Sequence, residues 1–143
     1  PEDPLSTIGI DLVGKIEIAT IGSHCHYAAV IKDIGATQYI WGFLLKTKDQ
    51  TAEKFDTWLA LVERLYNHKV KTVRSDGGGE FMGEFKSILQ KKGIRHVVTP
   101  PHTPEKNGAT ERANRSIFEV VRCLLHQANL PQMLWGEAFQ TAI

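Results

Sequence analysis

The chain has 143 residues, of which 42% are hydrophobic and 23% are charged, and its formal net charge is +1 at pH 7. This composition is typical of one soluble globular domain and excludes a disordered, collagen-like or low-complexity chain. The chain has no apolar run of the roughly 18–20 residues that span a bilayer, no signal-peptide pattern and only two cysteines, so we expect a protein that is neither membrane-bound nor secreted, in a reducing compartment.

Three strand-like runs make up the first part of the chain. Residues 5–13, 25–34 and 39–45 are rich in β-branched and aromatic side chains, and each run is bounded by glycine or polar residues. The connections at residues 21–24 and 35–38 are short enough to join antiparallel neighbours. This pattern predicts an antiparallel meander of three strands.

Helices and strands alternate in the rest of the chain. Apolar residues recur at helical spacing in four segments, which predict helices over residues 49–67, 81–93, 109–127 and from 131 to the C-terminus. Strands are predicted over 70–75 and 95–99, and the prolines within 100–108 predict a loop. The order βββαβαβαα is that of an α/β domain with a five-stranded mixed sheet flanked by helices. Because the last helix is still apolar where the sequence stops, we expect residues 1–143 to be one domain of a larger polypeptide.

Positive charge is concentrated in the middle of the chain. The segment from Ala60 to Arg122 holds 12 basic and 7 acidic residues, a net charge of +5, so the remaining segments together carry −4. This distribution is compatible with a face that binds a polyanion, although a solvated surface of mixed charge is the more frequent explanation.

Three acidic residues stand at unusual positions. Asp11 interrupts an apolar strand, Asp76 directly follows the strand over 70–75, and Glu111 opens a helix. Functional groups in α/β sheets concentrate at strand ends and adjoining helix starts, and three carboxylates gathered there would repel one another unless divalent cations neutralised them. Each residue also has a local explanation, because Asp11 suits a bulge or turn, Asp76 an Asx turn or helix cap, and Glu111 the first turn of a helix.

A family resemblance rests on several motifs in a fixed order. Residues 74–81 (RSDGGGEF) and 103–115 (TPEKNGATERANR) resemble the S-D-N-G-G-E-[FY] and T-P-x-x-N-G-x-x-E-R-x-N-R motifs of the integrase core of copia-type LTR retrotransposons. Residues 10–14 (IDLVG) are similar to the family's first catalytic Asp motif, and residues 130–138 to its L-P-x-x-x-W-x-E-A motif. The resemblance therefore covers nearly the whole chain.

The resemblance implies a ribonuclease H-like fold and a catalytic triad. The residues that match the family's catalytic triad are Asp11, Asp76 and Glu111, which the resemblance implies bind two Mg²⁺ or Mn²⁺ ions. These ions would support end processing and strand transfer by in-line phosphoryl transfer. It further implies DNA partners, namely the element ends and a target duplex, and a homo-oligomeric assembly without a membrane or a small-molecule substrate. The expected locations are the nucleus and a cytoplasmic virus-like particle.

Four further residues are candidates for DNA binding. If Glu111 faces the metal ions, Asn114 and Arg115 lie one turn further along the same helix face, where they could meet phosphate or a terminal base. Lys106 and Asn107 stand on the preceding loop, next to a glycine, which suits closure over DNA. The alternatives are an ion pair of Arg115 with Glu111 and a plain solvated loop.

Two rival functions stay open at this point. Gly77 replaces the usual Asn of the second motif, and the spacing between Asp76 and Glu111 is one residue shorter than is usual in the family. These departures leave open a decayed or co-opted copy that binds nucleic acid or protein without catalysis. The second rival is a nuclease of the same fold that cuts RNA in RNA–DNA hybrids, against which the motif over residues 103–115 argues.

Overall fold

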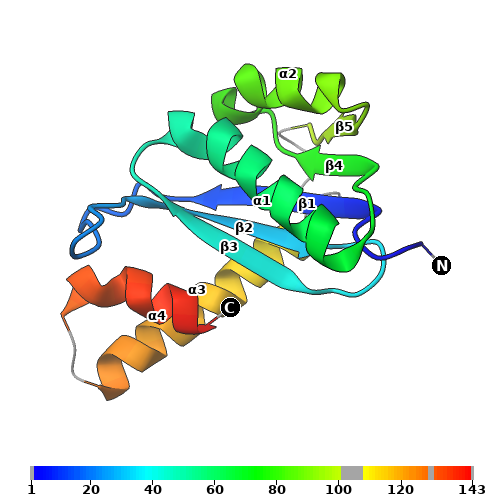
Figure 1. Ribbon diagram of the computed structural model, residues 1–143. Coiled ribbons are helices and arrows are strands. Elements are labelled where there is room, and N and C mark those ends of the chain that lie inside the picture. The colour runs from blue at the N-terminus through cyan, green and yellow to red at the C-terminus, as the bar shows by residue number, and fades with distance from the viewer. Residues whose placement is uncertain (1, 101–107, 129–130, 143) are drawn as a thin grey trace.

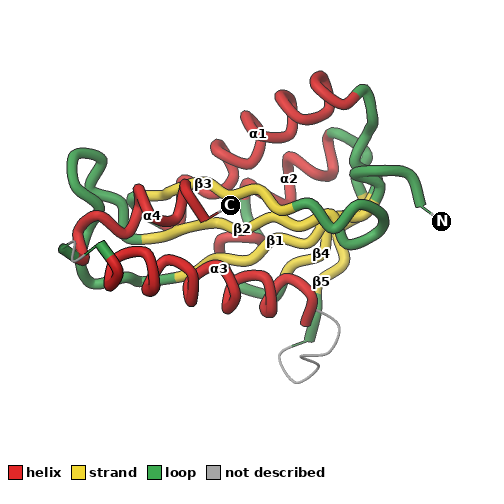
Figure 2. Tube along the Cα trace, turned by 90° about the horizontal axis from the view of Figure 1, so that it is seen from below, coloured by secondary structure: helices red, strands yellow, loops and turns green. Residues whose placement is uncertain are grey.

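The sheet of this protein lies between two pairs of helices. The structure is a computed structural model that describes residues 2–100, 108–128 and 131–142. Figure 1 shows α1 and α2 on one face of the sheet and α3 and α4 on the other, and the view from below in Figure 2 agrees. The strands are β1 (Thr7–Val13), β2 (Tyr27–Asp33), β3 (Ile40–Leu45), β4 (Thr72–Ser75) and β5 (Arg95–Val98). The helices are α1 (Thr51–Tyr66), α2 (Glu84–Lys91), α3 (Gly108–Gln127) and α4 (Trp135–Ala142).

The sheet is mixed, as the sequence predicts. Its spatial order is β3-β2-β1-β4-β5. The first three strands form the expected antiparallel meander, and β4 and β5 add to it as parallel strands on the other side of β1. Parallel neighbours need a crossover connection, and the chain supplies α1 before β4 and α2 before β5. As a result β1 lies at the centre of the sheet, where the antiparallel and parallel halves meet.

Each face of the sheet has its own hydrophobic core. Under α1 and α2, fully buried residues of β1 such as Ile8 and Ile10 pack with Phe55 and Phe85. On the opposite face, Val30 of β2 packs with residues of α3 and α4, which include Val121, Trp135 and Phe139. Because side chains alternate between the faces of a strand, a strand with both faces covered contributes to both cores.

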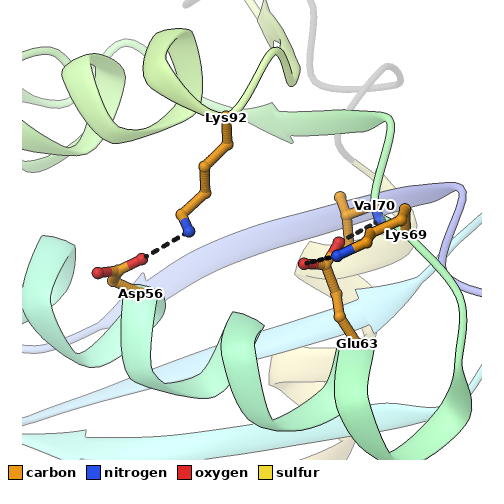
Figure 3. A network of polar contacts seen from close by, with 5 residues as sticks. All are labelled: Asp56, Glu63, Lys69, Val70 and Lys92. Carbon is orange, nitrogen blue, oxygen red and sulfur yellow. Dashed lines mark hydrogen bonds and ion pairs between the residues drawn. The ribbon is translucent and has the colours of Figure 1, made fainter.

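Polar contacts fasten α1 to the parallel half of the sheet. Figure 3 shows Glu63 accepting a 2.8 Å hydrogen bond from the backbone N–H of Val70 and lying 3.8 Å from the Lys69 ammonium. The same view shows Asp56 of α1 paired with Lys92, just after α2, at 3.4 Å. The Glu63 contact holds the segment that leads from α1 into β4 and so helps to set the start of that strand.

The predicted elements are all present among the described residues, and the differences are at their ends. The helix predicted from residue 49 begins at Thr51, because residues 48–50 form a 3-10 turn. That helix ends before Asn67, which takes a left-handed conformation with φ of 53°. The helix predicted over 81–93 is shorter, since residues 79–81 form a separate 3-10 turn.

Two further features concern the later part of the chain. Most of the loop predicted over 100–108 lies outside the described residues. In the described helices, none combines the length and the apolar character that crossing a bilayer requires.

Candidate active site

The register between β1 and β4 relates Asp11 to Asp76. The two strands run parallel, and the last of their three paired positions joins Gly9 to Arg74. Asp11 stands two residues beyond that pair within β1, and Asp76 stands two residues beyond it on the other side, directly after the last residue of β4. Neighbouring strands lie about 4.8 Å apart, and equivalent residues of parallel strands share one edge of the sheet. The fold therefore brings the backbone at Asp11 and the end of β4 that leads into Asp76 to the same end of the sheet.

Alternation along β1 puts Asp11 on the face that α3 covers. Ile8 and Ile10 of β1 are buried in the core under α1 and α2, so the next residue, Asp11, faces the other way. Val73 belongs to that same core, which puts Ser75 on its side, and β4 ends at Ser75, directly before Asp76. Asp11 is half-buried, whereas Asp76 is exposed.

Asp11 is held by hydrogen bonds to both carboxylate oxygens. Its Oδ1 accepts a 2.9 Å bond from the backbone N–H of Leu12, and its Oδ2 accepts a 2.7 Å bond from Nδ2 of Asn114 on α3. Asn114 is 9% exposed, and its own Oδ1 is buried without a hydrogen-bond partner in the described part of the chain. Since a carboxylate can only accept, the amide must present its NH₂ group to Asp11. The first turns of α3 are thereby docked onto β1.

Asp76 forms the Asx turn that its sequence context suggested as an alternative. Its Oδ1 accepts a 2.8 Å hydrogen bond from the backbone N–H of Gly78. This turn involves one carboxylate oxygen, and no hydrogen bond to Oδ2 is found within the described residues. A local turn and a role as a ligand are therefore compatible for this side chain.

A short polar chain lies behind Asp76, on the α2 side of the sheet. The Oγ of the buried Ser75 is 2.9 Å from the backbone oxygen of Asp76 and 2.7 Å from Nε2 of His96 on β5. Burial, together with the positive charge of Lys86, lowers the pKa of His96 below its ordinary value. Both effects disfavour the protonated form of the His96 ring.

The predicted roles of Glu111 and of the loop that holds Lys106 and Asn107 stay predictions. The backbone of Glu111 belongs to α3, three residues before Asn114, and positions three apart share one side of a helix. The Glu111 side chain, and Lys106 and Asn107 entirely, lie outside the described residues. Among the side chains that are described, no three His, Cys, Asp or Glu residues gather as a metal site. Convergence of the three carboxylates stays a prediction.

Comparison with known proteins identifies the family. Residues 1–104 match the family model described as the integrase core domain. The chain belongs to the integrase core domain family. The matched segment contains Asp11 and Asp76 and ends before Glu111.

Relatives of this integrase core domain come from plant transposons. It is 44% identical over 139 residues to the retrovirus-related Pol polyprotein from transposon TNT 1-94 of Nicotiana tabacum, an alignment that covers 96% of this chain and 10% of that protein. It is 36% identical over 140 residues to the corresponding polyprotein from transposon RE2 of Arabidopsis thaliana, covering 98% of this chain and 9% of that protein. The chain thus spans about a tenth of the length of these relatives.

A solved structure confirms the expected fold of the integrase core domain. The chain superposes, with a TM-score of 0.73 and 19% identity, on a chain of the cryo-EM structure of the simian T-cell lymphotropic virus intasome in complex with PP2A regulatory subunit B56 gamma. The match covers 97% of this chain and 47% of that one. At this identity the likeness establishes the fold alone, which is the ribonuclease H-like sheet with flanking helices.

A groove in the integrase core domain opens beside the Asp11–Asn114 contact. Its volume is about 1160 Å³, and it runs between α3 and the segment that follows β1. Its lining is mostly apolar, with Val13 and Phe118 among its walls, and it includes Asn114 and the exposed Arg115. Asn114 was predicted to contact DNA together with Arg115. The structure shows instead its bond to Asp11, and the DNA contact of both residues stays a prediction.

Two contacts of this site were not predicted from the sequence. The bond of Asn114 to Asp11 joins residues 103 positions apart, and the pairing of Ser75 with His96 depends on the β4–β5 register. Within the sequence, the signal for Ser75 and His96 is that each lies in a predicted strand, over residues 70–75 and 95–99. That position is also typical of ordinary buried polar residues.

Proposed function

We propose that this integrase core domain catalyses DNA integration for a copia-type LTR retrotransposon. The reaction would be divalent-metal-dependent end processing and strand transfer by in-line phosphoryl transfer. The observation that supports it most directly is the β1–β4 register, which sets Asp11 beside the end of the strand that leads into Asp76, in a chain of the integrase core family.

The donor set fits a hard divalent cation. Integrase cores generally use divalent metal ions. Asp11 and Asp76 offer carboxylate oxygens, as Glu111 would, and all-oxygen carboxylate ligands suit Mg²⁺ or Mn²⁺. In this proposal the three side chains hold two ions. When bound, such ions activate the attacking oxygen and stabilise the charge that develops on the transferred phosphoryl group.

Hydrogen bonds pre-orient the two described carboxylates for this role. The Leu12 N–H and the Asn114 amide set the plane of the Asp11 carboxylate, and the Gly78 N–H sets that of Asp76. Groups that orient a ligand reduce the conformational freedom that binding would otherwise remove. Lys106, Asn107 and Arg115 are proposed to bind the DNA backbone, and Asn114 to act near the scissile end through its contact with Asp11.

The proposed partners and setting follow from the family. We infer DNA and further copies of the chain as partners from its membership of the integrase core family. We propose the ends of the element and a target duplex as substrates, a homo-oligomer as the working form, and the nucleus and a cytoplasmic virus-like particle as locations.

Strand transfer tests the proposal directly. The 143-residue chain is incubated with a labelled duplex carrying the element end, a target duplex and Mn²⁺, and joined products are measured. We expect Asp76→Asn and Asp11→Asn to abolish joining, and Asp56→Asn, which removes a carboxylate from the far face of the sheet, to leave it intact. Titration of the wild type and these three variants with Mn²⁺ tests the metal site without relying on turnover: Asp76→Asn and Asp11→Asn should weaken Mn²⁺ binding, and Asp56→Asn should not.

Two outcomes would decide between the rivals. The proposal would be overturned in favour of a non-catalytic binding copy by two results together. The wild-type chain would join no DNA, and Mn²⁺ would stabilise the wild type no more than it stabilises Asp76→Asn. Cleavage of the RNA strand of an RNA–DNA hybrid, without joining of DNA ends, would favour the nuclease.

A further inference from the structure

The carbonyl group of Asp76 is fixed by a side chain that is itself held from the neighbouring strand. Ser75 is fully buried, and its Oγ lies within hydrogen-bond distance of both the Asp76 carbonyl oxygen, at 2.9 Å, and His96 Nε2, at 2.7 Å. His96 belongs to β5, which pairs in parallel with β4. The contact therefore crosses between strands and ends at the backbone of a proposed metal ligand.

Proton counting assigns the direction of both hydrogen bonds. A serine hydroxyl has one proton, and a carbonyl oxygen can only accept. Ser75 must therefore donate to Asp76, and His96 must donate from Nε2 to Ser75. This direction fixes the ring as the Nε2–H tautomer when it is neutral, and a protonated ring would donate from the same atom. The bond to Ser75 thus does not depend on titration of His96.

The surroundings of His96 hold its ring in this orientation. The Phe85 ring packs edge-on against it, with the centroids 5.7 Å apart. Its Nδ1 is buried and has no hydrogen-bond partner among the described residues, so Nε2 makes the one polar contact found for this ring. A buried histidine with one unsatisfied nitrogen is costly, and such a group calls for an explanation other than packing alone.

The chain after Asp76 explains why such a restraint matters. Three glycines follow, Gly77–Gly79, and without Cβ atoms they restrict the backbone least of all residues. The Asx turn from Asp76 Oδ1 to the Gly78 N–H spans this flexible segment. Fixing the Asp76 carbonyl limits rotation of the peptide that leads into the glycines, and so maintains the position of the carboxylate.

We propose that His96 is a positioning residue for Asp76, acting through the Ser75 hydroxyl that it orients. The inference rests on the proposed function, because it takes Asp76 to be a metal ligand. His96 touches neither DNA nor metal in this proposal. Its contribution is the geometry of Asp76.

Manganese binding and ring tautomerism test the proposal without turnover. The 143-residue chain and its variants are titrated with Mn²⁺, with free Mn²⁺ followed by electron paramagnetic resonance. We expect His96→Leu and Ser75→Ala each to weaken binding on the order of tenfold, the lower range for residues that orient metal ligands. Because both break one chain of contacts, the double variant should bind little worse than either single variant.

Conservative variants separate positioning from simple loss of packing. The Gln side chain can place an amide N–H where His96 Nε2 lies, so His96→Gln should bind close to wild type. The Asn amide is too short for that position, so His96→Asn should bind as weakly as His96→Leu. Ile88→Ala trims the same core from α2 without touching this chain of contacts, and it should leave Mn²⁺ affinity unchanged wherever the protein is folded. Imidazole ¹⁵N shifts should report the Nε2–H tautomer in the wild type.

The outcomes distinguish this inference from the proposed function. If Asp76→Asn abolishes Mn²⁺ binding while His96→Leu and Ser75→Ala, folded by circular dichroism, bind as the wild type does, the positioning role is wrong and the proposed function stands. Equal weakening in His96→Gln and His96→Asn, or an Nδ1–H tautomer in the wild type, would also overturn the positioning role. If the wild type binds Mn²⁺ no better than Asp76→Asn, the proposed metal site itself is wrong.

Discussion

Asn114 on α3 donates a 2.7 Å hydrogen bond to Oδ2 of Asp11 on β1, joining residues 103 positions apart. The contact docks the first turns of α3 onto the central strand of the sheet. The acceptor is a carboxylate, so the bond is charge-assisted, and it is partly buried because Asn114 is buried and Asp11 is half-buried. It should therefore contribute both to stability and to the orientation of the Asp11 carboxylate.

Removing the Asn114 amide should destabilise the domain. We expect Asn114→Ala to lower the free energy of unfolding by about 1.5–3 kcal/mol, the usual range for a hydrogen bond to a charged group. Urea denaturation followed by circular dichroism measures this change. The adjacent exposed Arg115→Ala serves as the control and should change stability by less than about 0.5 kcal/mol. Equal stability of the two variants would show that the Asp11 contact is energetically unimportant.

Asp33 should be an acid-sensitive anchor of the fold. It is fully buried at the end of β2 and accepts hydrogen bonds from the Thr37 hydroxyl and the backbone N–H groups of Leu5, Gly35, Ala36 and Thr37. Burial alone would raise the pKa of Asp33, but the bonds from Thr37 and the backbone outweigh it, and the net pKa is lowered. Its stabilising effect is therefore complete above the unfolded-state pKa near 3.9 and is lost as the pH falls through the lower folded-state pKa.

Asp33→Asn tests this anchor. The NH₂ group of the Asn amide would face the N–H and O–H donors that surround Asp33. We expect the free energy of unfolding to fall by about 2–4 kcal/mol at pH 7. Chemical denaturation at several pH values should show that the difference in the free energy of unfolding between wild type and variant becomes smaller in acid. The exposed Asp49→Asn, at a 3-10 turn, is the matched control. A difference in the free energy of unfolding that becomes larger in acid would contradict the lowered pKa of Asp33.

His96 should make the domain less stable in mild acid. Burial and the charge of Lys86 lower its pKa in the folded chain, so the unfolded chain binds the proton more readily. Where the unfolded state binds more protons, stability rises with pH. We therefore expect the free energy of unfolding to fall as the pH drops below about 6.5 towards the folded-state pKa. Thermal unfolding between pH 7.5 and pH 5 measures how steeply stability changes with pH, and the stability of His96→Gln should depend less on pH than that of the wild type.

Gly42 of β3 should not tolerate a side chain. A Cβ atom there would lie 2.5 Å from Cζ of Phe139 on α4 and 3.0 Å from the Ala29 carbonyl oxygen, so the helix would have to move. We expect Gly42→Ala to lower the free energy of unfolding by about 1–3 kcal/mol, which is typical of substitutions that overpack a core. Gly79→Ala meets nothing within 4 Å and is the control. Equal melting temperatures for the two variants would show that α4 does not pack on β3 as described.

Local patterns in the sequence were sufficient to predict the elements and their order. The strand around Asp11 is recognisable from its apolar run, and α3 from apolar residues at helical spacing, because both signals involve residues a few positions apart. Element ends were less accurate, since the 3-10 turns before α1 and α2 depend on hydrogen bonds that composition does not reveal. The family motifs singled out Asp11, Asp76 and Glu111, although the Glu111 side chain lies outside the described residues.

Side-chain partners could not be predicted from those patterns. The Asn114 bond to Asp11, the Ser75–His96 contact and the ring of donors around Asp33 each join segments whose distance depends on strand register and helix docking. Register is a property of two strands together, and one residue of slip would turn every side chain to the opposite face. The sequence by itself therefore determined the elements, their order and the candidate acids, whereas the tertiary structure alone decided which polar groups meet, because those contacts arise only once the whole sheet is assembled.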